Sequence, residues 1–212
     1  MKIQQKPGDR FWVEMKGMYQ PNDEQMVQFE RYAACLLECN QQFNLTGVKD
    51  LSGVVRSHFE DSLALVKFID LKTVSMIADI GSGAGFPGLP LKIMFPHLKV
   101  LLIEVTRKKR DFLADVVKML DLSDVEISDL DWRTFVRKTD YPIDMFVTRA
   151  ALDDLELSRM FQPACVYNAA TLVYWASKDW EQHKKTVALI NRVETYTIGS
   201  RERKLAFFSL PK

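Results

Sequence analysis

A glycine-rich turn between an apolar run and a short helical segment most constrains what this chain can fold into. Residues 78–88 read ADIGSGAGFPG and follow directly on an apolar run. Glycines allow backbone N–H groups to approach a ligand closely, next to the start of a helix where anionic groups bind. The dinucleotide pattern G-x-G-x-x-G would place a glycine where this chain has Phe86. The G-x-G-x-G spacing instead suits a ligand without a pyrophosphate, and S-adenosylmethionine is the natural candidate.

Beyond Lys72, short apolar runs alternate with helical periods, which is typical of a doubly wound, Rossmann-like α/β fold. Helices are expected from the glycine turn to Pro96, over 107–120 and around 153–162. Two β-rich runs, 192–198 and 204–210, predict an antiparallel hairpin at the edge of a mostly parallel sheet. The ligand is then expected at the carboxyl ends of the parallel strands. These strands are expected at 76–80, 99–103, 143–147 and 171–175.

The first 70 residues read as a helical lead-in to this core. Apolar residues at three- and four-residue steps predict one helix over 23–43 and a second over 52–69, with Ser52 as a possible cap. The segment before them, with Met15 and Tyr19, is expected to be poorly ordered. A length of 212 residues matches a single domain, with 1–70 as the lead-in and 71–212 as the cofactor-binding core.

Charge and cysteine usage set limits on partners and location. The chain has 29 Lys and Arg against 28 Asp and Glu, so it has almost no net charge, and any affinity for nucleic acid requires a local basic patch. The candidate patch is the run 107–110 (RKKR) with Arg133, Arg137 and Lys138. Three cysteines fit reduced thiols better than a disulfide framework. The first ten residues lack the layout of a signal peptide, and no apolar stretch is long enough for a membrane span. We expect a soluble cytoplasmic protein.

Two carboxylates accompany the glycine turn. Glu104 ends the next apolar run, about 20 residues after the turn, where an acidic side chain can accept hydrogen bonds from both ribose hydroxyls of a nucleoside. It can also be an ordinary surface carboxylate at a strand end. Asp79, at the entrance of the turn, either holds the turn or meets the amino group of the cofactor.

The absence of two known methyltransferase motifs narrows the set of atoms that this chain can methylate. Cys165 lacks the Pro-Cys context of a nucleophile for pyrimidine C5, and Val147-Thr148-Arg149-Ala150 replaces the Pro-Pro clamp common in enzymes that methylate exocyclic amines. A ring nitrogen such as guanine N7 carries an in-plane lone pair and no proton, so alignment can suffice without a general base. Arg149 can contact guanine O6, a phosphate or the cofactor.

An ordered set of motifs resembles the ribosomal RNA small subunit methyltransferase G family, also called glucose-inhibited division protein B. The resemblance runs from about residue 22 to the C-terminus. It implies a class I methyltransferase fold and a bacterial enzyme that transfers a methyl group from S-adenosylmethionine to N7 of a guanine in 16S ribosomal RNA. The motifs are Asn44-Leu45-Thr46-Gly47, Arg56-Ser57-His58 with Asp61-Ser62-Leu63, the turn 81–88, and Thr148-Arg149-Ala150.

The resemblance also implies roles for single residues. Arg149, His58 and Asn44 are expected at the active-site mouth as the catalytic group, without a metal. The partner is 16S ribosomal RNA or the small ribosomal subunit, no membrane is involved, and we expect a monomer. The residues expected to bind the cofactor are Asp79, Gly81, Ser82, Gly83, Gly85, Phe86, Glu104, Asp131, Trp132, Arg133 and Arg149.

Two segments depart from the pattern of this family. Leu130-Asp131-Trp132-Arg133 stands where the family usually has a Gly/Ser-Arg-Ala-Glu segment whose backbone meets the adenine, which leaves the adenine contacts open by a residue or two. Lys178-Asp179 stands where the family often has Lys-Gly. Two alternatives therefore stay open: a non-catalytic RNA- or ribosome-binding protein of the same fold, and a methyltransferase of small molecules.

Overall fold

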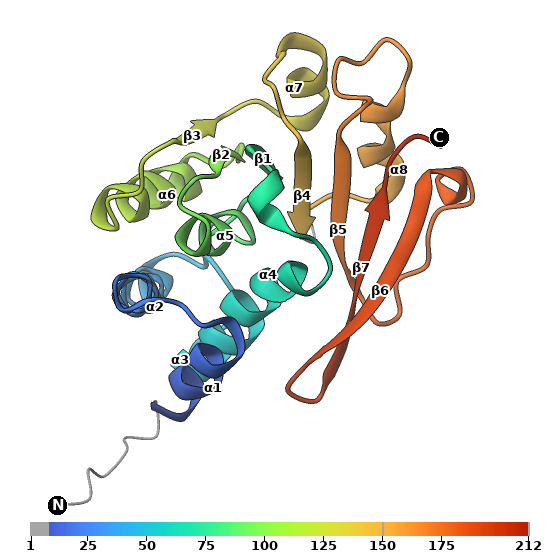
Figure 1. The fold of residues 1–212 in the computed structure, drawn as a ribbon. Helices are drawn as coiled ribbons and strands as arrows, with labels where there is room; N and C mark the ends of the chain where they lie inside the picture. Colours follow the sequence, from blue (N-terminus) through green and yellow to red (C-terminus); the bar gives the residue numbers. More distant parts are fainter. Residues whose placement is uncertain (1–8, 150, 212) are drawn as a thin grey trace, which may run out of the picture.

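A seven-stranded sheet forms the centre of the protein in a computed structural model, which describes residues 9–149 and 151–211 (Figure 1). The sheet order is β3-β2-β1-β4-β5-β7-β6. The predictions for residues 1–8 and for Ala150 concern positions outside the described residues. The strands are β1 (Met76–Ile80), β2 (Lys99–Ile103), β3 (Val125–Ser128), β4 (Met145–Arg149), β5 (Thr171–Ser177), β6 (Ile190–Ile198) and β7 (Arg201–Phe208).

The pairing of the strands confirms a mostly parallel sheet with an antiparallel hairpin. Strands β1 to β5 pair in parallel, whereas β7 pairs antiparallel with both β5 and β6. The chain proceeds from β1 outward to β3 and then returns to the other side of β1 with β4. In open α/β sheets ligands bind outside the carboxyl ends of the strands at such a reversal. The topology therefore places the candidate site between the ends of β1 and β4.

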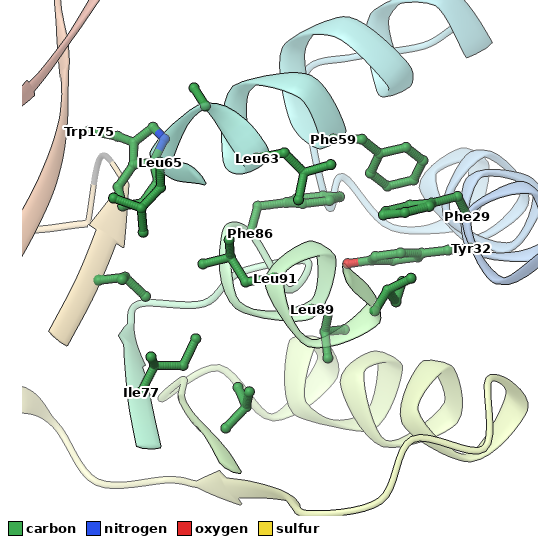
Figure 2. Packing of buried hydrophobic residues seen from close by; sticks show 14 of the residues in the cluster. Phe29, Tyr32, Phe59, Leu63, Leu65, Ile77, Phe86, Leu89, Leu91 and Trp175 are labelled. Atoms are coloured by element: carbon green, nitrogen blue, oxygen red, sulfur yellow. The ribbon is translucent and has the colours of Figure 1, made fainter. Parts of the chain in front are cut away.

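Apolar residues that alternate along the strands pack into two separate hydrophobic cores, one on each face of the sheet. On one face, Ile77 belongs to a cluster with Phe59 of the lead-in, and Figure 2 shows Phe29, Tyr32, Phe59 and Phe86 gathered there. On the other face, Ala78 belongs to a second cluster with side chains of the helices at 132–138 and 154–157. Because successive strand residues point to opposite faces, both faces of the sheet are covered by helices.

The helices cover the two faces unequally (Figure 1). Helices α1 to α6 lie on one side of the sheet, and α7 and α8 lie on the other. No helix among the described residues combines the length and apolar character that a membrane crossing needs. The helices are α1 (Asp9–Tyr19), α2 (Asp23–Gln42), α3 (Leu51–Val54), a π-helix (Val55–Glu60), α4 (Asp61–Leu63), α5 (Gly88–Met94), α6 (Arg107–Met119), α7 (Trp132–Lys138) and α8 (Asp154–Leu157), with 3-10 turns at Ala64–Lys67, Leu71–Thr73, Ser158–Phe161 and Val187–Leu189.

Two expectations for the lead-in are wrong. The second helix is not uniform: it passes from α3 through the π-helix into α4 and a 3-10 turn, and its cap is Asp50, whose side chain accepts a hydrogen bond from Gly53 N, not Ser52. The segment before α2 is ordered as α1. There Met15 is fully buried and the Tyr19 hydroxyl donates to Glu60 O, so tertiary packing holds this helix in place.

Candidate functional site

The glycine turn crosses over the end of β2 and is held there by its own backbone. The N–H groups of Gly81 and Ser82 donate to Ile103 O at 2.8 and 3.1 Å. Gly81, Gly83 and Gly85 have φ values of +68°, +60° and +94°, a region that side chains with a Cβ disfavour. A Cβ on Gly81 would lie 2.3 Å from the Cβ of Ala151, whereas a Cβ on Gly83 would have Gly81 O at 3.8 Å as its nearest neighbour. The turn therefore leaves open space beside Gly83.

Glu104 ties the turn to the end of β2. Its carboxylate is 5% exposed, and it accepts hydrogen bonds from Gly83 N (2.9 Å) and from Thr106 N (2.8 Å). It lines a cavity of about 420 Å³ at the carboxyl ends of β1 and β2, together with Gly81, Trp132 and Ala151. Glu104 is thus not an ordinary surface carboxylate: it is buried in the wall of a cavity beside the glycine turn.

Asp79 anchors the turn from below. It is fully buried, and its Oδ2 accepts a hydrogen bond from Gly88 N at 2.8 Å. Its Oδ1 has no hydrogen-bond partner among the described residues. Burial raises the pKa of this carboxyl to about 7, against a lowering by the bond from Gly88 N. The Asp79 side chain therefore holds the turn and keeps one further polar atom unpaired.

The raised pKa of Asp79 predicts a pH-dependent stability that Asp79→Asn removes. The folded protein keeps the proton up to about pH 7, whereas an unfolded Asp releases it near pH 4, so the contribution of the bound proton to stability is lost as the pH rises from about 4 to 7. We expect the free energy of unfolding of Asp79→Asn, relative to the wild type, to increase between pH 5 and pH 8 by up to about 1.4 kcal/mol per pH unit.

Urea unfolding of both proteins at pH 5 and pH 8 measures this difference, because the other titrating groups cancel between them. An equal difference at both pH values would show that Asp79 does not titrate between pH 5 and pH 8 and would contradict the raised pKa.

Arg149, at the end of β4, lies at the centre of a second cluster. Its Nη1 donates to Ser57 O at 2.9 Å and to Asp61 Oδ2 at 3.0 Å, and its Nη2 contacts His58 Nδ1 at 2.9 Å. The guanidinium also lies over the ring of Phe86, 5.2 Å from its centroid. Three hydrogen bonds and the contact with the face of the Phe86 ring hold the Arg149 guanidinium in one orientation.

The contacts of His58 fix its protonation. Burial, and next the charge of Arg149, lower the pKa of His58 to about 3, so the imidazole is neutral at pH 7. Because arginine only donates, Nδ1 of His58 accepts the bond from Arg149, and Nε2 donates to Thr46 Oγ1 at 2.7 Å. The His58 ring also stacks on Phe86, with centroids 4.4 Å apart. The imidazole orients its neighbours and carries no charge.

Asp61 connects this cluster to the C-terminal hairpin. Besides Arg149, its carboxylate accepts a hydrogen bond from the Tyr196 hydroxyl at 2.6 Å and lies 3.4 Å from the guanidinium of Arg203. Its backbone carbonyl accepts the indole N–H of Trp175. Asp61 and Arg149 are 5% and 13% exposed, so they form a nearly buried ion pair.

The structure brings together most of the residues expected at the site, but not all of them. Asp131 and Trp132 line the same cavity as Glu104, and Asp131 also caps α7 through Thr134 N. Arg133 instead forms a bidentate pair with Glu156 and lines neighbouring hollows. Asn44 is exposed in the turn that leads to Thr46.

Three residues around the cluster and the glycine turn were not in the expected set. Asp61 and Thr46 stand in the motifs that carried the family resemblance, but no spacing rule assigns them contacts with Arg149 and His58. Tyr32 of α2 is a third such residue, because its buried hydroxyl donates to Ala84 O inside the glycine turn and its ring stacks on Phe86.

The basic run 107–110 is largely occupied by local contacts. Lys109 Nζ lies 3.9 Å from Glu104 Oε2, and Arg110 donates to the carbonyls of Glu104 and Val105. Lys108 lies over the ring of Phe43, and Arg107 is 4.0 Å from Asp111. Within this run, Lys109 lines the cavity at Glu104.

The residues of the first cavity suit S-adenosylmethionine. Glu104 offers carboxylate oxygens for a ribose. Beside the cavity, the open side of Gly83 admits a close ligand, and the buried Oδ1 of Asp79 has no hydrogen-bond partner among the described residues. Ile103 and Trp132 add apolar lining. This donor and acceptor set fits a nucleoside with a polar aminoacyl tail.

Comparisons with known proteins identify the family that this chain resembles. Residues 25–206 match the model of a family described as rRNA small subunit methyltransferase G. Proteins named ribosomal RNA small subunit methyltransferase G are 32% identical in Lachnoclostridium phytofermentans, over 90% of this chain and 77% of the relative, and 34% identical in a Geobacillus species, over 86% and 81%.

Similar solved structures show the fold. A S-adenosylmethionine-dependent methyltransferase from Aquifex aeolicus superposes with a TM-score of 0.54 at 21% identity, over 75% of this chain and 94% of the other. TrmK of M. capricolum, solved with S-adenosylhomocysteine, gives 0.56 at 13% identity, over 71% and 68%. Both confirm a class I methyltransferase fold for this chain.

Proposed function

The chain belongs to the rRNA small subunit methyltransferase G family, and on this premise we propose that it transfers a methyl group from S-adenosylmethionine to N7 of a guanine in 16S ribosomal RNA. The main support for this proposal is that the cavity at Glu104 and the hollow at Arg149 lie next to each other at the end of β4. Ala151 lines the cavity with Glu104, and Arg149, two residues earlier, lines a second hollow with His58. One site suits the cofactor and the other suits an electron-rich substrate.

The cofactor is held by the glycine turn and the residues around it. Glu104 accepts hydrogen bonds from the ribose hydroxyls, and Asp131 and Trp132 border the adenine. Asp79 keeps the turn in shape through its hydrogen bond from Gly88 N. When bound, S-adenosylmethionine supplies an activated methyl group on a sulfonium centre.

The protein contributes orientation to the reaction. Guanine N7 has an in-plane lone pair and no proton, so its attack requires no general base, and the neutral His58 is not needed as one. Arg149 presents a fixed guanidinium that can donate to guanine O6. The Phe86 ring lies beneath the guanidinium, and the His58 ring, stacked on Phe86, accepts a hydrogen bond from it, so both limit its movement. The rate enhancement then comes from alignment.

The partner is 16S ribosomal RNA, either naked or within the small subunit. We propose that the chain acts there as a single methyltransferase domain, a monomer in the cytoplasm.

Transfer of tritiated methyl from S-adenosylmethionine tests this reaction. We expect label to enter unmodified 16S ribosomal RNA or small subunits that lack the modification, and not 23S ribosomal RNA. Label in neither small-subunit substrate, while S-adenosylhomocysteine still binds, would contradict the proposal and favour the non-catalytic or small-molecule alternative.

A further inference from the structure

The tip of the β6–β7 hairpin lies at the ligand edge of the sheet. Arg203 of β7 is paired with Ser177, the last residue of β5, so the antiparallel hairpin turns beyond the carboxyl ends of the parallel strands. Figure 1 shows this tip at the end of the sheet toward which β4 points. Topology thus brings residues 198–203 next to the end of β4, although more than 40 residues separate them in sequence.

Two hollows meet at this tip. One, of about 240 Å³, is lined by Ser57, His58, Asp61, Arg149, Ile198, Arg201 and Arg203. The other, of about 480 Å³, is lined by Ser177, Lys178, Thr197, Ser200, Arg201, Glu202 and Arg203. Both include Arg201 and Arg203 in their lining, so the two hollows adjoin at these side chains, one beside Arg149 and the other along the tip. We call the two adjoining hollows the groove.

The groove is cationic, and only some of its cationic side chains are paired with a carboxylate. Four cationic side chains face two carboxylates, while His58 is neutral. Arg149 and Arg203 are held by Asp61. Arg201 and Lys178 are exposed, and within the described part of the chain neither lies within 4.0 Å of a carboxylate. Arg201 has one long contact, 3.4 Å to Ser57 Oγ.

We propose that Arg201 and Lys178 bind the backbone phosphates of the RNA strand next to the target nucleotide. An unpaired guanidinium and an ammonium in a groove that leads from the base site are suited to phosphate oxygens, which arginine and lysine neutralise in protein–RNA complexes. Asp61 holds Arg203 and the hairpin against Arg149, so the phosphate contacts are kept in register with the base site. Glu202, at the rim, opposes the strand.

This inference rests on the proposed function for the identity of the substrate. It also assigns the phosphate contacts to the hairpin, whereas the sequence pointed to the run 107–110. Lys109 and Arg110 of that run contact Glu104 and Val105, whereas Arg201 lines the hollow that contains Arg149.

RNA binding by charge variants tests the proposal. The protein, saturated with S-adenosylhomocysteine, is titrated into unmodified 16S ribosomal RNA from about 50 to 300 mM salt. We expect Arg201→Ala to weaken binding about tenfold at low salt and to reduce the salt slope by about 0.7. Lys178→Ala should act in the same direction, Arg201→Lys should retain most of the affinity, and Glu202→Gln should bind more tightly than the wild type.

Arg31→Ala is the matched control, because it removes one positive charge from an exposed position of α2. It should leave the affinity and the slope within twofold of the wild type. Wild-type affinity and slope in both Arg201→Ala and Lys178→Ala would overturn the inference, as would an equal loss in Arg31→Ala or RNA binding that does not respond to salt.

Failure of the proposed function has a different signature. In that case the wild type transfers no methyl group, whatever the hairpin variants do to RNA binding. If the reaction is correct, Arg201→Ala should raise the KM for RNA about tenfold and leave kcat within about twofold, because phosphate contacts hold substrate and transition state alike.

Discussion

Replacing Arg149 by alanine is expected to reduce kcat for methyl transfer by about 100-fold or more, because the planar guanidinium that orients the guanine is lost. The same change leaves Asp61 with Tyr196 and Arg203 alone in a site where its carboxylate is 5% exposed. Removing one partner of a buried ion pair costs about 3–5 kcal/mol when the other charge is left uncompensated. Because Tyr196 and Arg203 still contact Asp61, we expect a smaller loss, measured as unfolding at lower urea concentration.

Arg149→Lys separates catalysis from stability. Lysine keeps the positive charge beside Asp61 but cannot reach Ser57 O, Asp61 and His58 Nδ1 with one planar head group. We expect it to restore much of the lost stability while kcat stays at least about tenfold below the wild type. Steady-state kinetics and urea unfolding measure the two effects. Wild-type kcat in Arg149→Lys would remove Arg149 from the account of base orientation.

Two glycines of one turn are expected to respond differently to alanine. Gly83→Ala places its Cβ in open space, so we expect a loss of only about 1 kcal/mol in stability from the left-handed backbone. That open side is where we propose the cofactor, and the affinity for S-adenosylhomocysteine should fall about 10- to 100-fold, since overpacking costs about 1–3 kcal/mol. Gly81→Ala drives its Cβ to 2.3 Å from that of Ala151 and should mainly destabilise the fold.

Calorimetric titration with S-adenosylhomocysteine and thermal unfolding of the two variants make the comparison. We expect Gly83→Ala to lose more affinity for S-adenosylhomocysteine than its small decrease in Tm accounts for. A Gly83→Ala protein that binds like the wild type would mean that the cofactor does not approach this face of the turn.

The sequence was informative where one local pattern decides the structure. Strands 76–80 and 99–103 match β1 and β2, and the helix that begins at Arg107 matches α6, because their apolar periods are complete within the segment. The strand Val125–Ser128 and the helix Trp132–Lys138 were not predicted. They span four and seven residues, too few for a period to show. Packing against the rest of the fold stabilises them.

The residues of the site also fall into those that a local motif predicts and those that only the fold brings together. The glycine turn and Glu104 form a motif within about 25 residues, and the structure places both at one cavity. The contacts of Arg149 with Asp61 and His58 join residues 88 and 91 positions apart. They also depend on a π-helix that the apolar period of 52–69 does not reveal. Pairings of that range follow from the order of the strands and not from spacing.

The identity of the methylated nucleoside tests directly whether this protein methylates N7 of a guanine. Small subunits that lack the modification are incubated with the protein and S-adenosylmethionine, the 16S RNA is digested, and the product nucleoside is identified by mass and chromatography. We expect 7-methylguanosine, present with the wild type and strongly reduced with Arg149→Lys. A methyl group on another atom or another base, or an unmodified RNA, would contradict it.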